Sequence, residues 1–188
     1  MERNIVPTLT REHQAVHEGV SFERHIDSAN LAVAALNVAF KTLAGSKRAH
    51  MIFGWSSNDE ILYEIIEGAT WDQGTGTALD IFEHSRGGGS STLILEDKNQ
   101  PAFTASNQVI KDVTNIAGGT TFEGQYTYNA SIGAGGIGET RFAAHEWILK
   151  ANTTYIVRAT KTDTNCKISI DMHWYEHTIN DTFEPNIS

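Results

Sequence analysis

Cysteine is almost absent from this sequence. Cys166 is the single cysteine among 188 residues, so no disulfide can form within the chain, which is compatible with a reducing compartment. A reactive thiol needs a nearby base and access to solvent. Cys166 instead falls on the apolar side of an alternating segment, and we interpret it as a small buried hydrophobic residue.

Long apolar runs are also missing. No stretch reaches the roughly 18 apolar residues that a membrane-spanning helix needs, and residues 1–14 carry charges where a signal peptide has an apolar segment. We therefore expect synthesis in the cytoplasm and no membrane partner. The formal net charge is −9, which is repelled by phosphate backbones, so we expect no direct nucleic-acid partner.

The common catalytic motifs are absent or lack their context. There is no Gly-x-Ser-x-Gly and no P-loop, and the glycines of 133–138 are not flanked by the strand and helix of a dinucleotide-binding loop. His13 and His17 lack the His-Glu-x-x-His order of zinc proteases. His173 and His177 lie about 13 Å apart on an extended strand. We predict a non-enzymatic protein with no catalytic residues, no cofactor and no metal site.

Period-2 alternation of apolar and polar residues is abundant. The clearest example is 166–177, where the even-numbered residues from 166 to 174 are apolar. Residues 61–66 are apolar on both faces, which predicts a central strand. A short polar turn joins 155–160 to 166–177, which predicts a hairpin. Further strands are predicted at 20–26, 36–40, 49–55, 77–84, 91–95, 108–113, 122–128 and 142–149.

This spacing of short strands predicts an all-β fold, an antiparallel β-sandwich of the jelly-roll type with a short N-terminal arm and helix. We divide the chain into an arm with a short helix (1–19), one sandwich domain (20–177) and a C-terminal tail (178–188). Because the arm has no core pattern of its own, we expect it to order on a partner.

Candidate partner-contact residues follow from this division. Within the arm they are Ile5, Val6, Pro7, His13 and His17. Trp71 is a further candidate, because it is the one tryptophan outside a strand pattern, and an exposed position suits the sequence as well as a buried one.

Several segments resemble a family encoded among the head genes of tailed bacteriophages. They are His17-Glu18-Gly19 with Phe22, Ala49-His50-Met51, Tyr63-Glu64 with Glu67-Gly68-Ala69-Thr70, Ile148-Leu149-Lys150 with Asn152-Thr153 and Tyr155, and Trp174-Tyr175-Glu176-His177. The resemblance is weakest between residues 96 and 135. It implies a capsid decoration or cement protein, located on the virion exterior, whose partner is the major capsid protein and which often forms a homotrimer.

Two other classes stay open. A carbohydrate- or receptor-binding sandwich of a tail fibre would use Trp71 to stack on sugars. A small metal-dependent enzyme of β-barrel type is suggested by the eight histidines.

Overall fold

The computed structural model describes residues 20–28, 35–42, 44–58, 60–72, 74–79, 81–84, 109–127, 141–142, 146–161 and 166–178. The predicted arm and its helix, strand 91–95, the glycine loop 133–138 and the tail beyond residue 178 lie outside these ranges. The strands are β1 (Ser21–Ser28), β2 (Ala35–Lys41), β3 (Lys47–Ser57), β4 (Ile61–Glu67), β5 (Thr77–Leu79), β6 (Phe82–Glu83), β7 (Val109–Lys111), β8 (Thr120–Thr127), β9 (Arg141–Phe142), β10 (Trp147–Ile148), β11 (Thr154–Lys161) and β12 (Ile168–Thr178). No helix that could span a membrane occurs in the described ranges.

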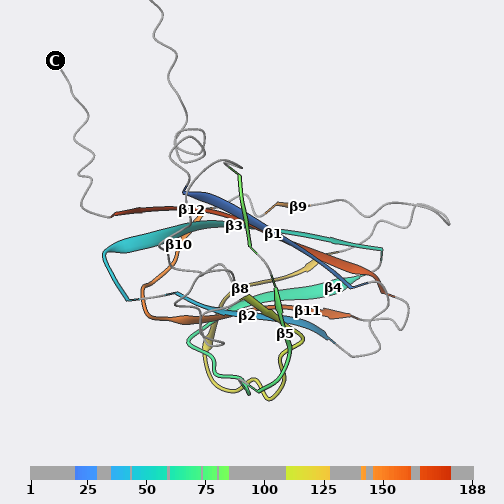
Figure 1. Ribbon diagram of the computed structural model, residues 1–188. Helices are drawn as coiled ribbons and strands as arrows, with labels where there is room; N and C mark the ends of the chain where they lie inside the picture. Colours follow the sequence, from blue (N-terminus) through green and yellow to red (C-terminus); the bar gives the residue numbers. More distant parts are fainter. Residues whose placement is uncertain are drawn as a thin grey trace, which may run out of the picture.

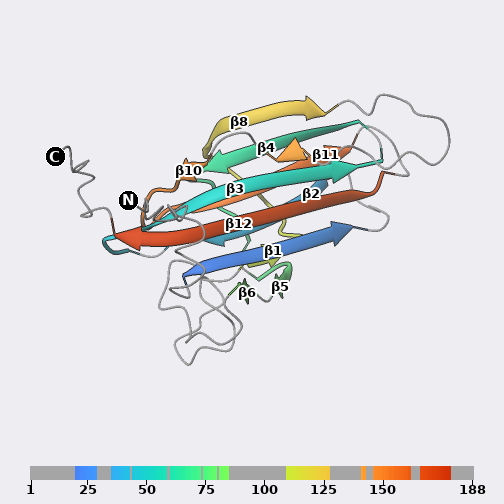
Figure 2. The same ribbon diagram turned by 90° about the horizontal axis from the view of Figure 1, so that it is seen from above.

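The strands form two antiparallel sheets that face each other (Figure 1). Sheet A has the order β10-β3-β12-β1-β6, with β9 also paired to β3, and sheet B has the order β5-β7-β2-β11-β4-β8. From above, β1, β12 and β3 run side by side across the whole sandwich (Figure 2). The predicted all-β antiparallel sandwich is confirmed.

The main core lies between the sheets and is built by the alternation. In β12, Ile168, Ile170, Met172 and Trp174 are at most 2% exposed, and Cys166 is fully buried just before the strand, as predicted. Removing such side chains from water is the main stabilising contribution, about 25 cal/mol per Å² of apolar surface.

The hairpin predicted for 155–177 is wrong. β11 pairs with β2 and β4 in sheet B, whereas β12 pairs with β1 and β3 in sheet A. The chain between them therefore crosses from one sheet to the other. A short polar connection between two alternating strands fits either arrangement. Crossing lets the apolar faces of both strands, for example Val157 and Ile170, enter the same core.

A second apolar cluster covers the outer face of sheet B. Two loop segments, 69–72 and 112–117, are joined by backbone hydrogen bonds of 2.9 and 3.0 Å between Thr70 and Ala117. The cluster comprises Ala39, Ile66, Ala69, Trp71, Ile110, Val113 and Ile156. It explains why β4 is apolar on both faces, since Ile65 enters the main core and Ile66 this cluster. The central position predicted for 61–66 is confirmed, because β4 lies between β11 and β8.

Candidate functional site

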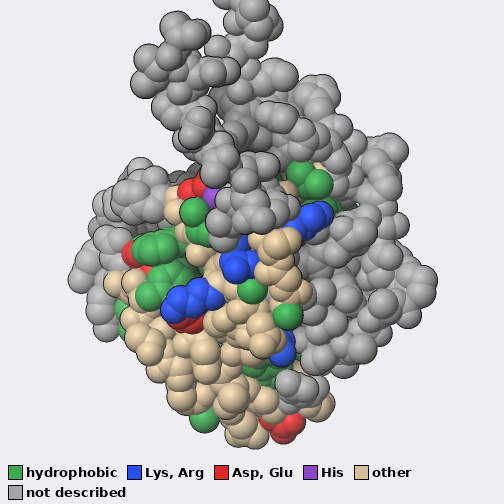
Figure 3. Space-filling view, turned by 90° about the vertical axis from the view of Figure 1, so that its left-hand side faces the viewer, with side chains coloured by type: hydrophobic (Ala, Val, Ile, Leu, Met, Phe, Trp, Pro, Cys, Tyr) green, Lys and Arg blue, Asp and Glu red, His purple; other side chains and the backbone are tan. Residues whose placement is uncertain are grey.

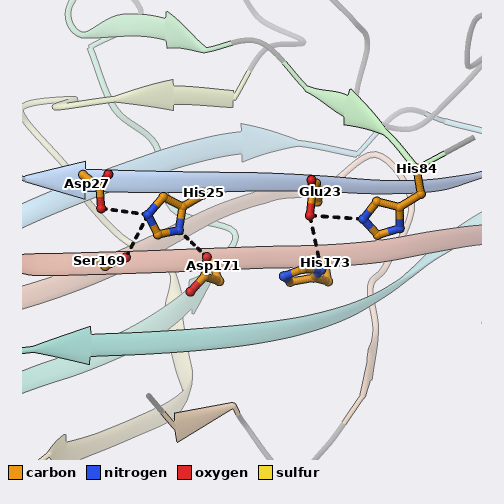
Figure 4. A network of polar contacts seen from close by, with 7 residues as sticks. All are labelled: Glu23, His25, Asp27, His84, Ser169, Asp171 and His173. Carbon is orange, nitrogen blue, oxygen red and sulfur yellow. Dashed lines mark hydrogen bonds and ion pairs between the residues drawn. The ribbon is translucent and has the colours of Figure 1, made fainter. Parts of the chain in front are cut away.

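The outer face of sheet A carries polar and ionisable side chains from β1, β12 and the residue after β6 (Figure 4). The odd-numbered residues of β1 and β12 share this face, because successive side chains alternate across a strand. The antiparallel register sets four of them directly opposite four others, beginning with Ser21 opposite Tyr175. The other three cross-strand pairs are Glu23 with His173, His25 with Asp171, and Asp27 with Ser169.

The first group on this face centres on His25. Its Nδ1 is paired with Asp171, and its Nε2 lies 2.8 Å from Asp27 Oδ1 and 3.3 Å from Ser169 Oγ. The hydrogen bond to Asp171 raises the pKa of His25 above its usual value, while partial burial opposes the shift. Because the His25 side chain is 56% exposed, this is a solvated ion pair with a small effect on stability.

The second group brings together Glu23, His84 and His173. Glu23 Oε2 lies 3.2 Å from His84 Nε2 and 3.9 Å from His173 Nδ1. His84 follows β6, and its backbone N–H donates to the Ser21 carbonyl oxygen at 2.9 Å. All three side chains are partly exposed, so this group is accessible to solvent.

The third group, His50, Glu146 and Tyr175, lies where β3 begins and β12 ends. The rings of His50 and Tyr175 stack with centroids 4.7 Å apart, and both residues are buried. His50 Nδ1 is paired with Glu146, and the Tyr175 hydroxyl lies 3.1 and 3.0 Å from the two oxygens of the same carboxylate. Next to this group Ile148, opposite His50 in the register, is 59% exposed.

The fourth group fixes the connection between β10 and β11. Lys150 Nζ donates to Glu67 Oε1 at 2.6 Å, and the Tyr155 hydroxyl donates to Glu67 Oε2 at 3.0 Å while accepting from the Lys150 backbone N–H at 2.9 Å. The hydrogen bond from Lys150 lowers the pKa of Glu67, and burial raises the pKa of Tyr155. The Thr42 hydroxyl donates to the Lys150 carbonyl oxygen at 2.6 Å. These contacts join the segment between β10 and β11 to the ends of β2 and β4.

The third and fourth groups lie at one end of the sandwich, which we call the arm end. Here β1 begins, β12 ends and β3 begins, because Ser21 is opposite Tyr175 and Thr178 is opposite Lys47. The described chain therefore enters and leaves the sandwich at the same end. Figure 3 faces this end and shows hydrophobic side chains beside Lys and Arg side chains. Basic residues placed here by the strand register and by the Lys150–Glu67 contact are Lys41, Lys47, Arg48 and Lys150.

The structure decides between the exposed and the buried position that the sequence left open for Trp71. It is 7% exposed and belongs to the second apolar cluster, so its ring is not available to stack on a sugar. The sequence shows that Trp71 lies in a loop, but it does not show whether another loop packs over the ring. In the structure, the loop 112–117 packs against it. The tryptophans in strand patterns are placed as predicted, since Trp55 and Trp174 are buried and Trp147 packs partly buried against the core. Ile5, Val6, Pro7, His13 and His17 lie outside the described residues.

The histidine–carboxylate groups were not predicted. The alternation of β12 indicates that His173 faces solvent, and the same pattern indicates this for Glu23 on β1. Nothing in the sequence shows that the first and last strands are neighbours, so the two residues cannot be paired from the pattern. Only the register of β1 against β12 brings them together.

Comparison of the chain with protein-family models, curated proteins and solved structures gives no significant match.

Proposed function

We propose that this chain is a non-enzymatic structural protein of a tailed-phage virion, a decoration protein that binds the outside of the capsid shell and stabilises it. The observation that carries the proposal is spatial. The segments that resemble the head-gene family are far apart in the sequence, yet most of those within the described ranges lie at the arm end, the exception being Tyr63-Glu64 within β4.

Three contacts join these segments to one another. Phe22 stacks on Trp174 with ring centroids 5.7 Å apart. The Leu149 N–H donates to the Ala49 carbonyl oxygen at 2.9 Å, and Tyr155 donates to Glu67 at 3.0 Å. These contacts are mostly buried, and they hold the exposed residues of the same segments, Ile148 and Lys150, at the arm end. We infer that these exposed residues belong to a binding surface.

The chemistry of the arm end suits a protein partner. Protein interfaces combine apolar contact with arginine and a polar rim. At the arm end Ile148 is exposed, its register partner His50 follows Arg48 by two residues, and Lys150 lies two residues further along the chain. Lys150 is paired with Glu67, and the other cations at this end, Lys41, Lys47 and Arg48, belong to a chain with a net charge of −9. Opposite charge on a partner steers association and fixes orientation, so we infer an acidic patch on the shell surface that receives this end.

β8 offers a second means of attachment. Within the described residues it pairs with β4 alone, and its eight residues exceed the two or three of β5, β6, β9 and β10, the other strands at sheet edges. Its first residues lie at the arm end, since Thr120 is opposite Glu67. An edge strand of this length presents backbone donors and acceptors that an extended segment of a neighbouring subunit can pair with.

A protein at this position would act by mass action. It binds the assembled shell and not the free subunits, and so shifts the equilibrium toward the shell. The arm, residues 1–19, would contact the capsid protein or a neighbouring copy in a trimer. No observation favours the carbohydrate-binding alternative, because Trp71, the side chain that motivated it, is buried.

The test uses heads of the phage that encodes the chain, prepared without this gene. Added protein is expected to cosediment with the heads at a saturating ratio and to raise the temperature at which they release DNA. Deleting residues 1–9 should weaken cosedimentation while leaving the melting temperature of the isolated protein unchanged. If the full chain does not bind such heads, the proposed function is wrong. If the shortened chain binds as well as the full chain, the role of the arm is wrong.

A further inference from the structure

We propose that Glu23, His84 and His173 form a binding site for a divalent first-row transition-metal ion, with Zn²⁺ as the ion to test. The three residues come from β1, from the residue after β6 and from β12, and they converge on the outer face of sheet A (Figure 4). This inference does not depend on the proposed attachment to a shell.

The geometry fits a small metal ion. One ligand atom from each residue lies within 4.8 Å of the other two. In a tetrahedral zinc site, ligand atoms 2.0–2.1 Å from the ion are roughly 3.4 Å from one another. The side chains would need to close by roughly 1.5 Å at most. They are 45%, 30% and 37% exposed for Glu23, His84 and His173, so they have room to make this adjustment.

The donor set selects the class of ion. Two imidazoles and one carboxylate suit zinc, iron and their neighbours, whereas calcium and magnesium prefer sites made of oxygen alone. Three protein ligands on an accessible face leave a coordination position for water or for a group from another molecule.

Ser21 positions His84 for this role. Its hydroxyl lies 2.9 Å from His84 Nδ1, while Nε2 of the same ring points toward Glu23. When Nδ1 carries the proton and donates it to the hydroxyl, the lone pair of Nε2 is directed at the site. Hydrogen bonding of the ligand's second nitrogen is the usual way in which a metal-binding histidine is oriented.

His25 supplies the matched control. It lies on the same strand and face as Glu23, and each of its ring nitrogens is paired with an aspartate, Asp171 or Asp27. Its two nitrogens thus face different carboxylates, and it is not part of the three-residue metal group found among the described residues.

The experiment measures zinc affinity by competition with a chromophoric chelator, on the full-length protein after metal has been stripped. We expect one Zn²⁺ per chain. His84→Ala and His173→Ala should each lower the affinity at least about 100-fold, and Ser21→Ala by about 10- to 100-fold. His25→Ala should leave it unchanged. The double variant His13→Ala/His17→Ala tests the remaining histidine pair singled out in the sequence and should also bind as the unaltered chain does.

Two further readouts separate ligation from damage to the fold. Glu23→Gln keeps the side-chain shape and should still weaken binding. The X-ray absorption spectrum of the unaltered chain loaded with one zinc should show two imidazole ligands. The proposal is overturned if zinc does not bind, if both histidine variants bind as tightly as the unaltered chain, or if the spectrum shows no imidazole.

Discussion

At the scale of single residues, His25 shows how a cross-strand neighbour sets the properties of a side chain. Its imidazole lies between carboxylates on β1 and β12. The hydrogen bond to Asp171 is the largest cause of its raised pKa, partial burial opposes the shift, and Asp27 adds to it. The charged form of His25 is therefore favoured in the folded protein more than in the unfolded chain.

Asp171→Asn should lower the pKa of His25, as measured by NMR titration of the imidazole. The pKa of His25 in the folded protein lies above the unfolded value of about 6.5. The ion pair of protonated His25 with Asp171 therefore stabilises the fold fully below about pH 6.5, and this stabilisation is lost as pH rises through the folded pKa. Because His25 is solvated, the contribution to the free energy of unfolding is about 1 kcal/mol or less. Asp72→Asn, in a loop over the other sheet, is the control and should leave the titration unchanged. An equal pKa in Asp171→Asn and the unaltered chain would contradict this account.

At the scale of elements, the entry of the chain into β8 depends on two glycines with left-handed backbone angles. Gly118 has φ of +67° and Gly119 of +83°. A Cβ added to Gly119 would lie 2.8 Å from the Ala69 backbone nitrogen and 2.8 Å from Ile66 Cγ2, whereas one on Gly118 would meet nothing within 4 Å. The two positions share the conformational requirement and differ in packing.

Replacing each glycine with alanine separates these two effects. Gly118→Ala should cost about 1–2 kcal/mol, the price of a left-handed non-glycine residue. Gly119→Ala should cost about 1–3 kcal/mol more, because the added methyl group overpacks the contact with Ala69 and Ile66. Denaturant unfolding of both variants measures the difference. Equal destabilisation would show that the loop moves aside without cost.

The positions of strands are easier to predict from the sequence than the pairing between strands. The described strands near 20–26, 36–40, 49–55 and 61–66 lie within a few residues of their predicted limits, because alternation is a local property of the chain. The predicted single strand 77–84 is instead divided into β5 and β6, which belong to different sheets. The hairpin between β11 and β12 failed for a related reason, since sheet membership depends on contacts between distant segments.

At the scale of the whole molecule, the surfaces of the sandwich differ in kind. Loops cover part of the outer face of sheet B, and the outer face of sheet A carries the histidine–carboxylate groups. The arm end combines apolar and basic side chains with the carboxylates of Glu67 and Glu146. β10 and β8 lie at the same edge, because Phe122 packs edge-on against Trp147 at 5.0 Å. β5 closes sheet B at the opposite edge.

This asymmetry predicts that a charge at the arm end affects binding more than the same charge at the far edge. Ile148→Glu should abolish cosedimentation with phage heads, because an apolar contact becomes a buried charge facing an acidic surface. Ala78→Glu, at an exposed position of β5, should bind normally. Both should change the free energy of unfolding by no more than about 0.5 kcal/mol, because both sites are exposed. If the two variants bind phage heads equally well, the arm end is not part of the interface.

The sequence by itself determined the all-β class, the core face of β12 and the burial of Cys166, because alternation and composition act within a few residues of each position. The tertiary structure alone decided which strands share a sheet, why Trp71 is buried, and that Glu23, His84 and His173 meet. These features depend on the register of β1 against β12 and on the loops over sheet B. Such long-range contacts form where the apolar faces of the whole chain can be buried together. The alternation within one strand does not indicate which other strand it pairs with or in which register.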